Sequence, residues 1–202
     1  MTHYFSEKQE SAINLKKIKI KIEETSLEFY SSSGVFSKDE LDKGTKLLIE
    51  NAEIGQNWDV LDLGCGTGVV GLFVKKRNPG TKILMADINE RAVMLSKKNI
   101  RLHGFDNIEA RKSDVFSNIK EHFDAILLNP PQTAGREVCF KMIEESKSHL
   151  KKDGLLEIVA RHNKGGETLS KKMGEVFGNV RDIAKKGGFR VYISQNSHDE
   201  NR

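Results

Sequence analysis

The stretch VLDLGCGTGVVG, residues 60–71, decides the fold of this 202-residue chain. An apolar run, Val60 and Leu61, leads straight into a glycine-rich turn, and helical spacing begins at about Val69. Glycine adopts backbone conformations that are closed to other residues and lets a ligand approach the backbone closely. The N-terminus of the following helix offers free N–H groups and the positive end of its dipole. This strand–turn–helix unit is typical of an α/β protein that binds a ligand at the turn.

Strand-like and helix-like segments alternate on the C-terminal side of this turn. We expect strands at Val60–Leu63, Lys82–Ala86, Ile108–Arg111, Phe123–Leu128 and Leu155–Ala160, with helices at Val69–Lys76, Glu90–Leu102, Glu137–Leu150 and Glu167–Phe177. Two further strands, Val180–Ala184 and Phe189–Ser194, flank Gly187–Gly188 and predict an antiparallel hairpin with a tight turn. The alternation predicts an α/β fold: a doubly wound, Rossmann-like sheet of seven strands, mostly parallel, with helices on both faces.

The segment before the turn predicts a small N-terminal cap. Isoleucines alternate with lysines over residues 17–22, which indicates a strand, and Leu27 to Tyr30 forms its hairpin partner. A helix is expected over Leu41 to Ala52. We therefore divide the chain into a cap (1–56), a catalytic core (57–195) and a flexible tail (196–202) within one structural domain. The lysines read as the solvated face of the strand, with contact to RNA phosphates as the alternative.

Composition narrows the class of protein. The net charge of +4 is compatible with a polyanionic partner. There is no apolar run of the roughly 18 residues that a transmembrane helix needs and no signal peptide at the N-terminus, so we expect no membrane contact. Cys65 and Cys139 are sparse and lack metal-ligand spacing, which predicts packing roles, no metal site and a cytoplasmic setting. We expect a monomer.

Two cofactors compete for the glycine turn. Gly66, Gly68 and Gly71 satisfy the G-x-G-x-x-G pattern of dinucleotide sites. Asp62, however, would lie near a pyrophosphate and repel it. S-adenosyl-L-methionine has no phosphate, and an acid at this position can face its cationic methionine end. The segment DLGCGTG also resembles the first motif of class I methyltransferases, so we predict S-adenosyl-L-methionine as the cofactor.

Further acids follow the next strands. Asp87 ends the second strand, where its carboxylate can accept hydrogen bonds from both ribose hydroxyls, although it could instead cap the helix that starts near Asn89. Asp114 follows the third strand and can accept from the adenine amino group. Ligands of open α/β sheets bind at these carboxyl ends. The predicted cofactor-binding residues are Asp62, Gly64, Gly66, Gly68, Asp87, Ile88, Asp114, Val115 and Asn129.

The sequence Asn129-Pro130-Pro131-Gln132 follows the fourth strand and suggests the chemistry. The prolines fix the backbone as a rigid corner that presents two acceptors, the Asn129 side-chain oxygen and the Pro130 carbonyl. Two acceptors can hold the hydrogens of an exocyclic amine, direct its lone pair at the sulfonium methyl and stabilise the charge that develops on nitrogen. We predict Asn129 and Pro130 as the catalytic residues.

The motif resembles the [Asn/Asp/Ser]-Pro-Pro-[aromatic] signature of amino-group methyltransferases, with one departure. The aromatic residue, which usually stacks on the target base, is replaced by Gln132. Phe36 is the leading candidate to supply stacking, and Tyr4 and Phe5 are weaker ones. We expect Pro131 and Gln132 to contact the substrate.

A more specific resemblance lies ahead of the glycine turn. SGVFS at 33–37 and LDKGTKLL at 41–48 are similar to the ribosomal RNA small-subunit methyltransferase C family, which makes N2-methylguanosine in small-subunit rRNA. HYFS at 3–6 and the NPP-x-x-x-G spacing to Gly135 match too. Larger members carry a second, degenerate copy of the domain, whereas this chain has one copy. The resemblance implies Phe36 near the active site and cofactor contacts at Asp62, Gly64, Gly66, Asp87, Asp114 and Asn129.

The resemblance implies an N-methyltransferase that acts on guanine N2 of RNA. Arg136 and Arg161, with His162 beside the latter, follow the fourth and fifth strands, and we expect them to touch the RNA backbone. Three other amines remain open: tRNA guanine, DNA adenine and a protein glutamine amide. A non-catalytic RNA-binding or ribosome-assembly factor that retains the cofactor fold is the alternative from another class.

Overall fold

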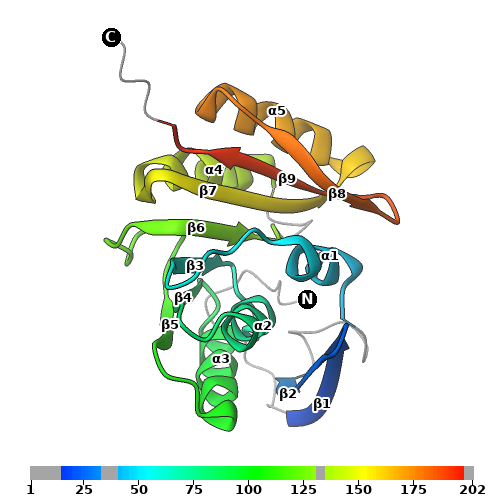
Figure 1. Ribbon diagram of the computed structural model, residues 1–202, viewed down its shortest axis with the longest axis vertical. Helices are drawn as coiled ribbons and strands as arrows, with labels where there is room; N and C mark the ends of the chain where they lie inside the picture. The colour runs from blue at the N-terminus through cyan, green and yellow to red at the C-terminus, as the bar shows by residue number, and fades with distance from the viewer. Residues whose placement is uncertain (1–14, 33–40, 131–134, 198–202) are drawn as a thin grey trace.

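The computed structural model describes residues 15–32, 41–130 and 135–197. Its centre is a sheet built from β3 (Asp59–Leu63), β4 (Lys82–Asp87), β5 (Ile108–Lys112), β6 (Phe123–Leu128), β7 (Leu150–Arg161), β8 (Arg181–Lys186) and β9 (Phe189–Gln195). The seven strands lie in the order β5-β4-β3-β6-β7-β9-β8 (Figure 1). Strands β3 to β7 run parallel, and β9 is antiparallel to both β7 and β8. The predicted doubly wound sheet with a C-terminal antiparallel hairpin is confirmed.

Helices cover both faces of the sheet (Figure 1). On one face lie α1 (Lys43–Asn51), α2 (Val69–Arg77) and α3 (Glu90–His103), and on the other α4 (Arg136–His149) and α5 (Gly166–Phe177), preceded by a 3₁₀ turn at His162–Lys164. Side chains of the central strand alternate accordingly: Val60 packs into the first core, and Leu61 and Leu63 into the second. A strand buried on both faces therefore carries apolar residues at successive positions, as Val60 and Leu61 do in β3.

The order of the strands places the site. Strand β3 pairs with β4 on one side and with β6 on the other, so the chain reverses its direction of winding beside β3. Ligands of open α/β sheets bind outside the carboxyl ends of the strands at such a switch point. The turns that follow β3, β4 and β6 meet there.

Most boundaries differ from the sequence prediction by a residue or two, and at three of them the structure shows the cause. The fifth predicted strand begins at Leu150 instead of Leu155, because Leu150 already pairs with Phe123 before the register shifts. The preceding helix therefore ends at His149. The helix expected from Leu41 begins at Lys43, because the Asp42 side chain caps it by accepting the Thr45 N–H.

Both predicted hairpins are present. Gly187 and Gly188 have φ of 57° and 81°, the positive values that a two-residue turn between β8 and β9 requires. At the other end, β1 (Leu15–Ile22) and β2 (Thr25–Ser32) form a separate antiparallel pair. Its apolar side packs on α2 and α3. The part of the chain that the structure describes has no helix long and apolar enough to cross a membrane.

Candidate functional site

The glycine turn lies between the carboxyl ends of β3 and β4. The N–H of Gly64 donates to the carbonyl of Ala86 over 2.8 Å, which ties the turn to β4. Gly64 has a φ of +73°, and a Cβ built there would meet no described atom within 4 Å. A Cβ on Gly68 or Gly71 would instead lie 2.9 or 2.6 Å from Met85 Sδ. Packing against Met85 at Gly68 and Gly71, together with the positive φ of 57° at Gly66, accounts for the G-x-G-x-x-G pattern without a dinucleotide.

Asp87 connects the end of β4 to the glycine turn. Its carboxylate accepts from the N–H of Gly66 over 2.9 Å and from the N–H of Asn89 over 2.8 Å. Burial raises the pKa of Asp87, although these backbone donors oppose the shift. The capping alternative is wrong: Asn89 caps α3, with its side-chain oxygen accepting from two N–H groups of the first turn. The Asp87 carboxylate lies at the end of β4, and its contact with a ribose stays a prediction.

Asp62 lies beneath the turn and is almost fully buried. Its Oδ2 accepts from the N–H of Gly71 over 2.9 Å, so the side chain ties β3 to the first turn of α2. Burial raises its pKa to about 7. The turn is therefore flanked by two carboxyl groups, Asp62 and Asp87, where a pyrophosphate site would need donors or cations.

The loop after β5 carries Asp114 and Val115. Asp114 is exposed, whereas Val115 is buried with a φ of 50°. A β-branched residue adopts such a conformation only when its surroundings enforce it. Here the hydroxyl of Ser113 donates to the Val115 carbonyl over 2.8 Å. The backbone that carries both predicted cofactor contacts, Asp114 and Val115, is thus held in a strained shape by Ser113.

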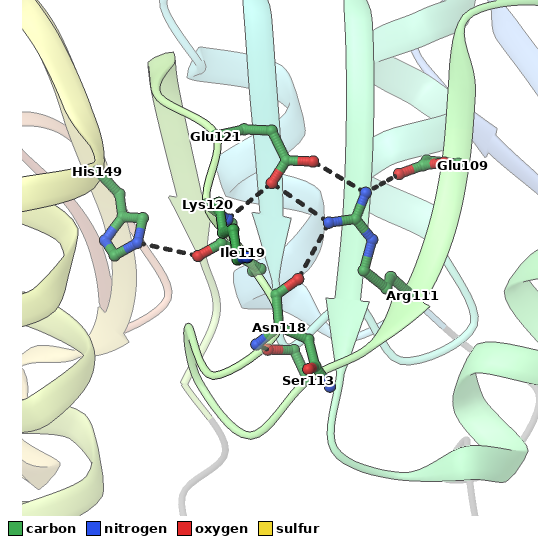
Figure 2. Close-up of polar contacts among 8 residues, drawn as sticks. All are labelled: Glu109, Arg111, Ser113, Asn118, Ile119, Lys120, Glu121 and His149. Carbon is green, nitrogen blue, oxygen red and sulfur yellow. Dashed lines mark hydrogen bonds and ion pairs between the residues drawn. The ribbon is translucent and has the colours of Figure 1, made fainter.

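A network of polar side chains holds this loop (Figure 2). Asn118 donates its N–H to Ser113 Oγ over 3.1 Å, and Arg111 donates to the carbonyl of Asn118 over 3.0 Å. Arg111 is itself paired with Glu121 over 2.9 Å. The ring Nε2 of His149, on α4, lies 3.2 Å from the carbonyl of Ile119. Sequence reasoning did not identify these residues, because their role is to bond loop backbone.

Asn129 follows β6, and its side-chain amide is held by two residues that lie more than 80 positions earlier in the sequence. Its Nδ2 donates to Asp42 Oδ2 over 3.0 Å and to Thr45 Oγ1 over 2.8 Å. Both acceptors belong to the start of α1. Because both amide hydrogens are used, the side chain presents its oxygen Oδ1 to whatever lies beyond it, as the proposed amine chemistry needs.

A pocket of about 200 Å³ opens next to Asn129 and Pro130. The predicted substrate residues Arg136 and Arg161 both line it, and so does Lys164, which sequence reasoning missed. Arg161 lies over the ring of Phe189, with 4.9 Å from its guanidinium carbon to the ring centre. His162, which the sequence grouped with Arg161, does not line the pocket; its Nδ1 lies 2.9 Å from the hydroxyl of Tyr192.

Several predicted residues lie outside the described ranges. These are Pro131, Gln132 and the stacking candidates Phe36, Tyr4 and Phe5. Both cysteines are buried, as expected, and burial raises the pKa of each thiol.

Comparison with known proteins identifies the family. The model of the methyltransferase small domain matches residues 26–193. A Bacillus subtilis protein, uncharacterized protein YbxB, is 38% identical over 192 residues, which are 94% of this chain and 96% of that protein. The chain belongs to the methyltransferase small domain family. It is a methyltransferase that uses S-adenosylmethionine, as the sequence predicts.

Other members of this family carry a substrate in their names. Ribosomal RNA small subunit methyltransferase C of Actinobacillus succinogenes is 39% identical over 173 residues, covering 82% of this chain and 50% of that protein. A Thermus thermophilus 16S rRNA guanine-N2 methyltransferase (RsmC), solved with S-adenosylmethionine and guanosine, superposes with a TM-score of 0.78 at 20% identity. It is covered over 51% of its length and this chain over 92%, which shows a shared fold. The chain thus spans about half the length of these rRNA methyltransferases.

The glycine turn fits the cofactor of this family. Acceptors flank the turn in the form of Asp62 and Asp87, which suit hydroxyl and ammonium donors and disfavour phosphate. The hydroxyl of Thr67, buried within the turn, has no partner among the described residues, so one hydrogen-bonding group there is unused.

The signal for the missed pair Asp42 and Thr45 was present in the LDKGTKLL motif, but nothing in the sequence connected it with Asn129.

Proposed function

We propose that the protein methylates the exocyclic amine N2 of guanine in RNA, with ribosomal RNA as the substrate class. The observation that carries the proposal is the amide of Asn129, whose two N–H groups are engaged by Asp42 and Thr45. Its oxygen is therefore available as an acceptor at the rim of a pocket lined by cations. No feature of the described residues favours tRNA guanine, DNA adenine or a glutamine amide as the substrate.

Asn129 and Pro130 position the amine that accepts the methyl group. S-adenosylmethionine supplies a methyl group on a positively charged sulfur. The nitrogen of guanine N2 is a poor nucleophile, since its lone pair is delocalised into the ring. Acceptance of its two hydrogens by Asn129 Oδ1 and the Pro130 carbonyl favours a tetrahedral nitrogen and stabilises the positive charge that develops there. No strong general base is required, because the proton can leave to solvent after transfer.

The pocket supports a polyanionic substrate. Arg136, Arg161 and Lys164 are exposed and line one pocket wall or rim with Asn129. None of the three forms an ion pair with a residue that the structure describes. Cations without ion-pair partners among the described residues, next to the Asn-Pro corner, are suited to RNA phosphates.

The named relatives support guanine in ribosomal RNA. Family members that are 39% and 37% identical to this chain are ribosomal RNA small subunit methyltransferases C. The Thermus thermophilus protein of the same fold acts at N2 of a guanine in 16S rRNA and was solved with guanosine. The base and the position of the methyl group rest on this relationship and on the Asn129–Pro130 corner.

A substrate comparison tests the proposal. The purified protein is incubated with labelled S-adenosylmethionine and, separately, with naked rRNA, immature small ribosomal subunits, tRNA, DNA and protein. We expect label in rRNA or in the immature subunit, as N2-methylguanosine after digestion to nucleosides. Label in tRNA, DNA or protein would show that ribosomal RNA is the wrong substrate class. Label in N6-methyladenine would show that guanine is the wrong base. Tight RNA binding without any methyl transfer would favour the assembly-factor alternative. Comparing RNA from wild-type and deletion cells then locates the nucleotide.

A further inference from the structure

The start of α1 lies beside the end of β6 and contacts the Asn-Pro corner there. Asp42 and Thr45 are separated from Asn129 by 87 and 84 residues in sequence, yet each lies within hydrogen-bonding distance of its amide nitrogen. The Asn129 backbone is kept extended by Pro130, so the rotation of its side chain is the freedom that remains to be fixed. The amide can face the substrate with its oxygen or with its nitrogen, and only the oxygen can accept hydrogens from an amine.

The chemistry of Asp42 selects one of the two orientations. A carboxylate only accepts, so the group 3.0 Å from Asp42 Oδ2 must be a donor. A flipped amide would bring its oxygen against this carboxylate and would lose two hydrogen bonds. Thr45 selects the same orientation, because its hydroxyl donates to Asp42 over 3.2 Å and therefore turns a lone pair toward Asn129.

We propose that Asp42 and Thr45 are positioning residues that hold the Asn129 amide with its oxygen toward the methyl-accepting amine, an inference that rests on the proposed function. Donation to a carboxylate also polarises the amide and makes Oδ1 a stronger acceptor. Neither residue touches the reacting atoms in this arrangement. They act through Asn129, and their loss reduces turnover without weakening cofactor binding.

Helix capping alone does not account for this arrangement. Asp42 Oδ2 caps α1 by accepting the Thr45 N–H over 2.9 Å, and Asn or Ser would serve that purpose as well. The same oxygen accepts two further hydrogens, one from the Thr45 hydroxyl and one from Asn129. Variants at position 42 that retain the cap therefore separate positioning from the stability of α1.

The first test removes the acceptors one at a time. Thr45→Val keeps the shape of the side chain but not the hydroxyl, and Asp42→Ser keeps the cap but withdraws the acceptor from Asn129. We expect each to lower kcat about tenfold with the cofactor Kd unchanged, since an oriented hydrogen bond is lost. Thr45→Ser restores activity. Asn51→Ala is the matched control, because among the described residues the Asn51 side chain bonds only the Leu47 carbonyl within α1, so it should affect stability but not kcat.

The second test exchanges the two partners. Asn129→Asp places a carboxylate 3.0 Å from that of Asp42, and we expect kcat to fall by about 100-fold or more. Adding Asp42→Asn restores a donor opposite an acceptor and should recover about tenfold of this loss, a coupling that independent sites do not show. The same rescue is expected in the melting temperature, which is read without any substrate.

The outcomes separate this inference from the proposed function. Wild-type kcat in Thr45→Val, or no recovery of activity and melting temperature in the exchanged pair, overturns the positioning role. Absence of methyl transfer to RNA by the wild-type protein overturns the proposed function instead, and the melting temperatures then still report whether the two side chains are coupled.

Discussion

Glu157 lies in the middle of β7, and its side chain is closed off from solvent. Oε1 accepts from the N–H of Glu53 over 2.9 Å, while Oε2 has no partner among the described residues. Burial raises the pKa of Glu157 from 4.5 to about 8, and the nearby charge of Glu53 acts in the same direction. The folded protein therefore keeps a proton on this carboxyl group at pH values where the unfolded chain has lost it.

This difference makes folding depend on pH with a known sign. As pH rises from 4.5 to 8, the unfolded state releases the proton and the folded state retains it. The contribution of Glu157 to the free energy of unfolding is therefore fully present below this window and is lost across it. At about 1.4 kcal/mol for each pKa unit, the loss between pH 5 and pH 8 is about 3.5 kcal/mol. For a chain of 202 residues this corresponds to about 8 °C in melting temperature.

Glu157→Gln removes the titration while keeping the acceptor for the Glu53 N–H. We expect the variant to gain about 3.5 kcal/mol relative to the wild type between pH 5 and pH 8, above any constant offset from its unpaired amide group. Denaturant melts at both pH values measure this difference, in which Asp62 and the other titrating groups cancel. Glu175→Gln, at an exposed position of α5, is the control and should show no such change. A difference between variant and wild type that stays constant with pH would refute the reasoning.

Three further predictions concern the site. Asn129→Ala should lower kcat by about 100-fold or more while calorimetry finds the cofactor Kd nearly unchanged, and a normal rate would exclude the amine-holding role. Asp87→Ala should weaken cofactor binding about tenfold or more, and an unchanged Kd would remove this carboxylate from the ribose. Arg136→Ala should reduce RNA affinity and flatten its salt dependence by about 0.7 to 0.9 in the logarithmic slope. Lys19→Ala, in the lysine run of the hairpin, should leave that slope unchanged; equal effects would move the RNA contact to the cap.

Local signals in the sequence were sufficient for most of the fold. The alternation of lysine and isoleucine over residues 17–22 predicted a strand with one buried face, and Ile20 and Ile22 are buried. Gly187–Gly188 predicted the turn of the last hairpin, because glycine readily adopts the positive φ that such a turn requires. Boundaries were less certain where pairing decides them, as at Leu150, whose partner is Phe123.

Polar partners were the part that sequence reasoning could not assign. Asp87 was a candidate cap for α3 on spacing alone, but Asn89 has that role. Asp62 was assigned to the methionine end of the cofactor, and its bond to the Gly71 N–H became visible only in three dimensions. Hydrogen-bond partners depend on distances of about 3 Å, and spacing along the chain does not fix these once the partners lie on different elements.

The sequence by itself determined the glycine turn, the methyl donor and the presence of an Asn-Pro corner, because each is encoded in a few consecutive residues. It determined the α/β class through the alternation of strand-like and helix-like segments. Only the tertiary structure decided which way the Asn129 amide faces and which cations share its pocket. Asp42, Thr45, Arg161 and Lys164 reach that corner from α1 and from the end of β7. The order of strands in the sheet, which no local pattern contains, brings them together.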